Sequence, residues 1–203
     1  MTVVPDRSHF EAAYQGRAPW DIDSAQPALI EVADDVTGSI LDAGCGTGEN
    51  ALFLAARGHK VTGIDYLDEP IRRAKQKAAA RNLQATFLVM DALALKDLPE
   101  TFDSIVDCGL FHCFDDDARR RYVAGLATVL KPGGRLWLLC FSTDEPGTLG
   151  PRRISQRELH AAFAEGFAVE SIEPTRFNVR ADMPELAFSP GGPKAWLAVI
   201  ARK

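Results

Sequence analysis

The sequence lacks the features that mark membrane-bound and secreted proteins. No window approaches the roughly 18 continuous apolar residues that would suggest a membrane span, so no membrane partner is expected. The four cysteines, at positions 45, 108, 113 and 140, show no Cys-x-x-Cys spacing, and no positively charged leader precedes an apolar stretch. These absences argue against a disulfide framework and predict a cytoplasmic protein in a reducing compartment.

An excess of positive charge is also missing. The 23 Lys and Arg residues are outnumbered by 28 Asp and Glu residues, which gives a formal net charge of −5. No global positive field is therefore available to hold a polyanion. Basic clusters at 72–77, 119–121 and 152–157 lie on or beside predicted helices, where a solvated helix face explains them. Nucleic acid is accordingly not expected as a partner.

The residues that are present predict one α/β domain. With 203 residues, 46% of them hydrophobic, the chain can bury a single well-packed core. Strand-like and helix-like segments alternate, which indicates a mostly parallel sheet flanked by helices. The predicted strands span residues 39–44, 60–65, 85–91, 103–109, 135–142, 167–177 and 195–203. The predicted helices span residues 8–15, 50–57, 70–81 and 118–130, and a capping box at 155–158 opens one more.

A glycine-rich turn follows the first predicted core strand. The segment 40–50 reads ILDAGCGTGEN, and the absent glycine side chains let a ligand approach the backbone. A dinucleotide-binding fingerprint would need glycine or alanine where Glu49 stands, and no Gly-Lys-Ser/Thr closes a phosphate-binding loop. Glu49 at a helix start would also repel a pyrophosphate. The loop therefore favours a nucleoside ligand without phosphates.

Three carboxylates end successive predicted strands, namely Asp42, Asp65 and Asp91. Asp65 lies 21 positions after Gly44, where a carboxylate can accept both ribose hydroxyl protons. Asp91 is placed to accept from an adenine amino group, with the backbone of Ala92 beside it. Each aspartate alone could instead cap a loop. Three in series favour the binding of adenosine.

Five ordered motifs within residues 38–142 resemble those of class I S-adenosylmethionine-dependent methyltransferases. They are LDAGCGTG at 41–48, GID at 63–65, MDA at 90–92, FDSIVD at 102–107 and LKPGG at 130–134. The resemblance implies an α/β, doubly wound, seven-stranded and mostly parallel sheet with an antiparallel last strand, the Rossmann-like methyltransferase fold. It also implies S-adenosyl-L-methionine as cofactor and S-adenosyl-L-homocysteine as product.

The same resemblance implies a set of cofactor-binding residues. They are Trp20, Asp42, Gly44, Cys45, Gly46, Asp65, Tyr66, Asp91, Ala92 and Cys108. The methionine end of the cofactor is expected over the glycine turn and the ribose on Asp65. Tyr66 is expected to make an apolar contact to the adenosine, and the backbone after Cys108 to meet the cofactor's amino group.

The amino-terminal motif Pro19-Trp20-Asp21, followed by Ala25-Gln26-Pro27, resembles that of small-molecule methyltransferases. These are the thiol and thiopurine methyltransferases and the bacterial heterocyclic-toxin methyltransferases. The resemblance implies methyl transfer to an O, S or N nucleophile of a small, aromatic or heterocyclic molecule. A thiol or halide/thiocyanate methyltransferase and a non-catalytic S-adenosylmethionine-binding domain remain alternatives. A nicotinamide-dependent oxidoreductase is disfavoured by Glu49 and by the chain length, and no set of metal ligands is apparent.

Proton removal from a hydroxyl or thiol acceptor would need a base. His112, just past the fourth core strand, is the best-placed residue, and its titration range suits the role. The alternative is a histidine that only hydrogen-bonds a loop.

The expected organisation is one methyltransferase domain over residues 1–203, with a cofactor-binding core at 38–142. An amino-terminal arm, residues 1–27, carries Trp20, and a cover loop, residues 178–193, connects the last two strands. The topology that the resemblance implies puts both near the carboxyl ends of the central strands, where doubly wound sheets bind ligands. There Trp20 and the loop's apolar residues would cover the methyl group; the alternative is that they complete the core. Those loop residues are Met183, Leu186 and Phe188. The oligomeric state, monomer or dimer, is left open.

Overall fold

One seven-stranded sheet runs through the protein. The computed structural model describes residues 5–16, 18–183 and 187–203. The strand order is β3-β2-β1-β4-β5-β7-β6, and only β7 runs antiparallel to its neighbours. The predicted doubly wound α/β sheet with an antiparallel last strand is thus confirmed. The strands are β1 (Ser39–Ala43), β2 (Lys60–Asp65), β3 (Thr86–Val89), β4 (Phe102–Cys108), β5 (Leu130–Phe141), β6 (Phe167–Arg176) and β7 (Lys194–Arg202).

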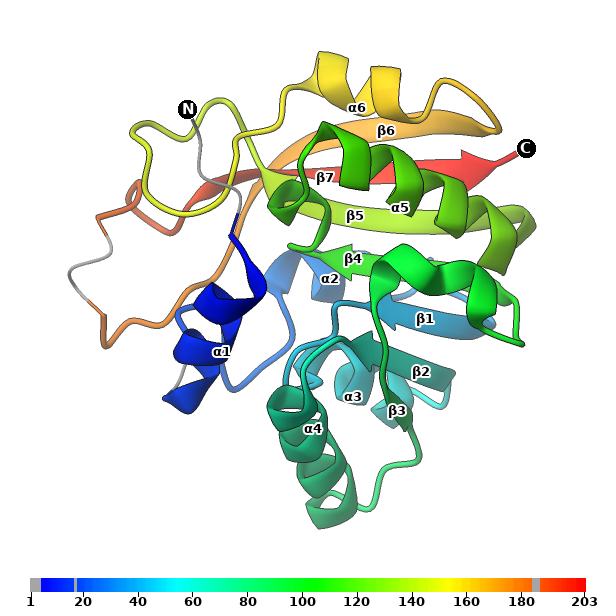
Figure 1. Cartoon of the computed structure of the whole chain (residues 1–203), viewed down its shortest axis with the longest axis vertical. Coiled ribbons are helices and arrows are strands. Elements are labelled where there is room, and N and C mark those ends of the chain that lie inside the picture. Colours follow the sequence, from blue (N-terminus) through cyan, green and yellow to red (C-terminus); the bar gives the residue numbers. More distant parts are fainter. Residues whose placement is uncertain (1–4, 17, 184–186) are drawn as a thin grey trace.

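Helices cover both faces of this sheet (Figure 1). They are α1 (Arg7–Gln15), α2 (Pro27–Glu31), α3 (Glu49–Ala56), α4 (Asp68–Ala80), η1 (Ala92–Asp97), η2 (Phe111–Cys113), α5 (Asp116–Val129) and α6 (Gln156–Ala162). Alternate strand residues enter two different cores: Ile105 packs with η1, α5 and α6, whereas Val106 packs with α2, α3 and α4. This alternation explains why the central strands are apolar on both faces.

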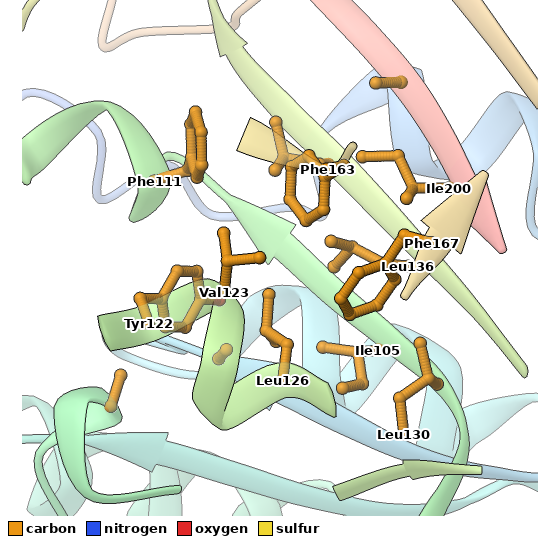
Figure 2. Packing of buried hydrophobic residues seen from close by; sticks show 14 of the residues in the cluster. Ile105, Phe111, Tyr122, Val123, Leu126, Leu130, Leu136, Phe163, Phe167 and Ile200 are labelled. Carbon is orange, nitrogen blue, oxygen red and sulfur yellow. The ribbon is translucent and has the colours of Figure 1, made fainter. Parts of the chain in front are cut away.

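The core under α5 and α6 fixes the segment that carries His112. Figure 2 shows Phe111 and Phe163 among the buried side chains of this cluster. Their ring centroids are 5.7 Å apart and stacked, and Phe163 meets Phe167 edge-on at 5.4 Å. Burial of each such ring contributes about 1.5–3 kcal/mol. Phe111 therefore anchors η2, and with it the neighbouring His112, against α6.

Most element boundaries differ from the prediction by one or two residues, and α2 was not predicted. Two of the differences have a clear local reason. The strand predicted at 85–91 ends at Val89, because Asp91 accepts a hydrogen bond from the Leu93 N–H and caps η1. The strand predicted at 135–142 begins at Leu130, which pairs with Phe102 before the sheet register shifts. The described part of the cover loop forms neither helix nor strand.

Helix α1 and the cover loop lie beyond the carboxyl end of β4 (Figure 1). Parallel sheets of this kind bind ligands at that edge. Among the described residues, no helix is both long and apolar enough to cross a bilayer.

Candidate active site

The glycine turn between β1 and α3 places bare backbone at this edge. Gly44, Gly46 and Gly48 have φ of 71°, 53° and 85°, a region that favours glycine. A Cβ on Gly48 would lie 2.9 Å from a side chain of α4, so this glycine serves helix packing. A Cβ on Gly44 would lie 3.0 Å from the Leu110 side chain, and a Cβ on Gly46 would lie 2.8 Å from the Tyr14 hydroxyl. The first two glycines therefore face the side chains that line the strand ends.

Asp65, at the end of β2, is tied to the glycine turn. Its Oδ2 accepts a hydrogen bond of 3.2 Å from the Gly46 N–H, and its Oδ1 accepts one of 3.0 Å from the Leu67 N–H. Burial raises the pKa of Asp65, although both backbone hydrogen bonds oppose the shift. Both carboxylate oxygens are thus held beside the turn.

Two more carboxylates are buried at the ends of β1 and β4. Burial raises the pKa of Asp42 to about 7, and no described residue donates a hydrogen bond to its Oδ2. Burial also raises the pKa of Asp107 to about 6. Asp107 accepts hydrogen bonds from the backbone of Leu110 and Phe111 and from the Tyr122 hydroxyl, and so shapes the turn after β4. Of the buried strand-end carboxylates Asp42, Asp65 and Asp107, only Asp42 has an oxygen that no described residue satisfies.

The structure places the other predicted cofactor-binding residues at or near this edge. Asp91 is exposed and caps η1, and Ala92 is buried in the core under α5. The Cys45 N–H donates to the Ile64 carbonyl at 2.8 Å, which joins the turn to β2. Burial raises the pKa of the Cys45 and Cys108 thiols well above the usual range, so neither is a thiolate. Tyr66 is half-buried and meets Phe10 of α1 edge-on at 6.1 Å.

His112 connects the end of β5 with the turn after β4. Its Nδ1 accepts a hydrogen bond of 3.0 Å from the Phe141 N–H. Burial, with the nearby cations Arg153 and Arg119, lowers the pKa of His112 to about 3. The ring is therefore neutral, its lone pair at Nδ1 is engaged, and the proton sits on Nε2. This geometry favours the second of the two alternatives, a histidine that hydrogen-bonds a loop.

Aromatic rings gather around His112. Phe141 and Phe177 lie 5.2 Å and 5.7 Å from its ring, and Phe188 of the cover loop meets Phe141 edge-on at 5.7 Å. A Cβ on Gly109 would lie 3.4 Å from the His112 Nε2 and 3.5 Å from Phe177. We call Phe141, Phe177 and Phe188 the aromatic cluster; it reaches the glycine that follows β4 through Phe177.

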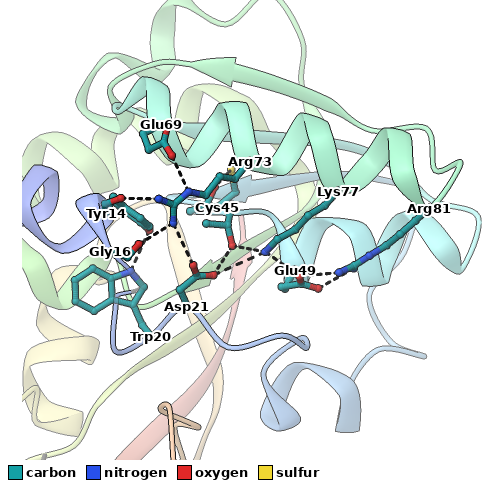
Figure 3. Close-up of polar contacts among 12 residues, drawn as sticks. Tyr14, Gly16, Trp20, Asp21, Cys45, Glu49, Glu69, Arg73, Lys77 and Arg81 are labelled. Atoms are coloured by element: carbon teal, nitrogen blue, oxygen red, sulfur yellow. Dashed lines mark hydrogen bonds and ion pairs between the residues drawn. The ribbon is translucent and has the colours of Figure 1, made fainter. Parts of the chain in front are cut away.

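Hydrogen bonds join the amino-terminal arm to α4 and to the glycine turn (Figure 3). Arg73 donates to the carbonyls of Tyr14 and Gly16 at 2.7 Å and 2.9 Å. The buried Asp21 accepts a hydrogen bond of 2.6 Å from the Thr47 hydroxyl of the turn. Lys77 in turn donates to that hydroxyl at 2.7 Å. The arm and the turn thus form one connected unit.

Glu49 belongs to the same network. It is the residue that stands where a dinucleotide-binding fingerprint would need glycine or alanine. Its carboxylate pairs with Lys77 at 2.9 Å and with both terminal nitrogens of Arg81 at 2.8 Å. These partners lower the pKa of Glu49, although burial opposes the shift. Glu49 therefore joins α3 to α4.

The arm is also joined to the cover loop. The Gln26 side-chain amide donates a hydrogen bond of 3.0 Å to the Asn178 carbonyl and accepts one of 2.9 Å from the Asn178 backbone N–H. The Arg180 N–H donates to the Pro19 carbonyl at 2.9 Å. Met183 is half-buried, and Leu186 lies outside the described residues. Sequence reasoning singled out Trp20 and quoted Gln26 within a motif without giving it a role, and it missed Tyr14. The signal for Tyr14 was its place on the apolar face of α1.

Comparisons with known proteins agree with this geometry. Residues 40–134 match the model of a methyltransferase domain family. The chain is 33% identical over 196 residues to the 2-heptyl-1-hydroxyquinolin-4(1H)-one methyltransferase of Mycobacteroides abscessus, covering 90% of this chain and 85% of that protein. It is 29% identical over 162 residues to the probable thiol methyltransferase 2 of Arabidopsis thaliana, covering 77% and 72%.

Two solved structures have the same fold as this chain. A protein described under the conversion of a disulfide bond into a thioacetal group during echinomycin biosynthesis superposes with a TM-score of 0.86 at 35% identity, covering 100% of this chain and 93% of that one. The Burkholderia thailandensis 1,6-didemethyltoxoflavin-N1-methyltransferase, with its heterocycle and S-adenosylhomocysteine bound, superposes with a TM-score of 0.72 at 25% identity, covering 97% and 86%.

A doubly wound sheet with a bare glycine turn, a strand-end carboxylate beside it and these relatives define a class of enzyme. The chain belongs to the S-adenosylmethionine-dependent methyltransferases, and S-adenosyl-L-methionine is its methyl donor. Within the described residues no group of three or more His, Cys, Asp or Glu side chains forms a metal site.

Proposed function

We propose that this enzyme methylates an O, S or N atom of a small aromatic or heterocyclic molecule. The observation that carries the proposal is the aromatic cluster beside Gly109, at the carboxyl end of β4, next to the glycine turn. Planar rings stack well on aromatic side chains. The relatives that act on a hydroxyquinolone and on didemethyltoxoflavin support the same acceptor class.

The residues at the strand ends suit a cationic cofactor. S-Adenosylmethionine carries a sulfonium and an ammonium group, and buried carboxylates complement both charges. In this proposal Asp42 receives the ammonium group, the ribose lies on Asp65, and the methionine end crosses Gly44 to Gly46. The remaining predicted residues surround the adenosine and the cofactor's amino group: Trp20, Tyr66, Asp91, Ala92 and Cys108.

The chemistry needs little acid or base assistance at carbon. The acceptor attacks the methyl carbon, the S–CH₃ bond breaks, and its electron pair neutralises the sulfonium. The protein has to align the acceptor and exclude water. We assign His112 a positioning role, because it holds the end of β5 and the aromatic cluster in place. In this proposal the acceptor loses its proton to solvent before the methyl group is transferred.

The arm and the cover loop form the wall that closes this site. Three backbone and side-chain hydrogen bonds join them through Gln26, Asn178, Arg180 and Pro19. Phe188 brings an aromatic ring from the loop onto the cluster. The two segments would therefore move together when an acceptor enters.

Incubation with methyl-labelled S-adenosylmethionine and a panel of acceptors tests the proposal. The panel holds hydroxy-, thio- and aza-aromatics, together with hydrosulfide, iodide and thiocyanate. We expect label in the aromatic compounds. Preferential methylation of the inorganic anions would favour a thiol or halide methyltransferase. Cofactor binding without any turnover would favour a non-catalytic binding domain.

A further inference from the structure

Tyr14 is a buried phenol that the mechanism so far does not use. It is the buried residue of α1, with only 5% of its surface exposed. A Cβ built on Gly46 would lie 2.8 Å from the Tyr14 hydroxyl oxygen and 3.9 Å from Cζ. The hydroxyl, and not the ring, therefore sits directly over the backbone of Gly46.

The neighbours of Gly46 indicate which part of the cofactor would meet this oxygen. The Gly46 N–H donates to Asp65, the carboxylate assigned to the ribose, and Gly44 lies toward the methionine end. In S-adenosylmethionine the sulfonium lies between the ribose and the amino-acid chain. A cofactor laid from Asp65 to Gly44 therefore brings its sulfonium past Gly46 and beside the Tyr14 oxygen.

The hydroxyl oxygen is held in one position. Burial, and next the charge of Asp65, raise the pKa of Tyr14 far above its ordinary value, so the group stays a neutral phenol. The Trp20 Nε1–H donates to the Tyr14 oxygen at 3.0 Å, which leaves the oxygen one further lone pair. Arg73 holds the Tyr14 carbonyl at 2.7 Å (Figure 3). The oxygen is thus preorganised as an acceptor.

We propose that Tyr14 positions the sulfonium of S-adenosylmethionine. Its oxygen accepts C–H···O contacts from the polarised groups on sulfur and holds the methyl group toward the acceptor site. No proton moves to or from Tyr14. When the methyl group leaves, sulfur becomes a neutral thioether and the contact weakens, so the residue distinguishes cofactor from product. This inference rests on the cofactor placement proposed above.

Tyr14→Phe isolates the oxygen, because the ring keeps its packing. We expect calorimetry to show S-adenosylmethionine binding weakened by about 3- to 5-fold, while S-adenosylhomocysteine binding changes less than about 2-fold. Tyr66→Phe is the matched control, since it removes a phenolic hydroxyl beside Asp65, and the ratio of the two affinities should stay as in the wild type. Equal weakening of both ligands by Tyr14→Phe, or no change in either, would overturn the proposal.

A second measurement needs no variant. The methyl protons of ¹³C-methyl S-adenosylmethionine should shift downfield on binding to the wild-type protein, as expected for a C–H···O contact. An unshifted bound resonance would contradict the proposal. Failure of the wild type to bind S-adenosylhomocysteine at all would instead contradict the cofactor placement itself.

Discussion

The carboxylate of Asp21 accepts a hydrogen bond of 2.6 Å from the hydroxyl of Thr47, and this contact links the amino-terminal arm to the glycine turn. Asp21 is buried, and Arg73 and Lys77 each place a cationic nitrogen 3.8 Å from its carboxylate. An arm held in this way stays on the cofactor site, so the strength of the contact bears on both stability and binding.

Replacing Asp21 by Asn should destabilise the fold by about 1–3 kcal/mol, because the buried acceptor of the Thr47 hydrogen bond loses its charge. Arg73 and Lys77 lose one carboxylate neighbour each but keep Glu69 and Glu49. Urea unfolding measures the change. The control is Glu11→Gln, which breaks the exposed pair with Arg7 and should leave stability unaltered. If the Asp21→Asn variant has the same free energy of unfolding as the wild type, the arm is not held by this network.

Asp65→Ala should weaken the binding of S-adenosylhomocysteine by about 1.5–3 kcal/mol for each charge-assisted hydrogen bond lost. The variant also loses the bond to the Gly46 N–H, so its fold is first checked by circular dichroism. Calorimetry on the folded variant gives the affinity. If that affinity equals the wild-type value, the ribose does not lie on Asp65.

Cofactor affinity should depend on pH through Asp42. The pKa of Asp42 in the free protein is about 7, and a bound ammonium group favours the carboxylate, so binding releases a proton. The affinity for S-adenosylhomocysteine should therefore rise as pH increases from about 5, by at most about tenfold per unit, and level off above about pH 7. Since the folded pKa exceeds the unfolded value of about 3.9, the stability of the free protein falls over the same range.

The Asp42→Asn variant distinguishes the titration of Asp42 from that of Asp107, whose pKa of about 6 lies in the same pH range. The variant should bind S-adenosylhomocysteine more weakly above pH 7 and with a flatter pH profile. Calorimetry at a series of pH values decides the matter, and an unchanged slope in the variant would assign the linkage to another group.

His112→Asn should retain turnover within about fivefold of the wild type, because the amide oxygen can accept the hydrogen bond from the Phe141 N–H. His112→Ala leaves that buried N–H unpaired and should cost about 1–3 kcal/mol of stability. Methylation rates of both variants between pH 6 and 9 provide the test. A loss of about 100-fold or more in both, with the wild-type rate following one ionisation, would restore His112 as a general base.

Gln26→Ala should loosen the cover loop from the arm, because only the bond between Arg180 and Pro19 remains of the three. We expect the KM for an aromatic acceptor to rise about tenfold while S-adenosylhomocysteine binds nearly as before, because two hydrogen bonds of about 1 kcal/mol each are lost. Steady-state kinetics and calorimetry measure the two effects. Ala181→Ser, at an exposed position of the same loop, serves as control. An unaltered KM in Gln26→Ala would mean that the two segments do not act as one cover.

The sheet and the glycine turn follow from local sequence signals. Apolar runs mark β1, β4 and β5, and glycines stand where the turn needs positive φ. Local chemistry also explains why the third strand is shorter than predicted: the Asp91 carboxylate caps η1, which begins at Ala92. The residues that shape the acceptor site depend instead on long-range contacts, such as Gln26 with Asn178 and His112 with Phe141. No periodicity in the sequence encodes those pairs.

A crystal structure with S-adenosylhomocysteine and the compound that the panel identifies would test the central claim most directly. We predict that the compound's ring packs on Phe141 and Phe177, beneath the cover loop, with the acceptor atom in line with the cofactor's sulfur beside Gly46. A ring bound away from the aromatic cluster, or a sulfur atom directed away from it, would contradict the account.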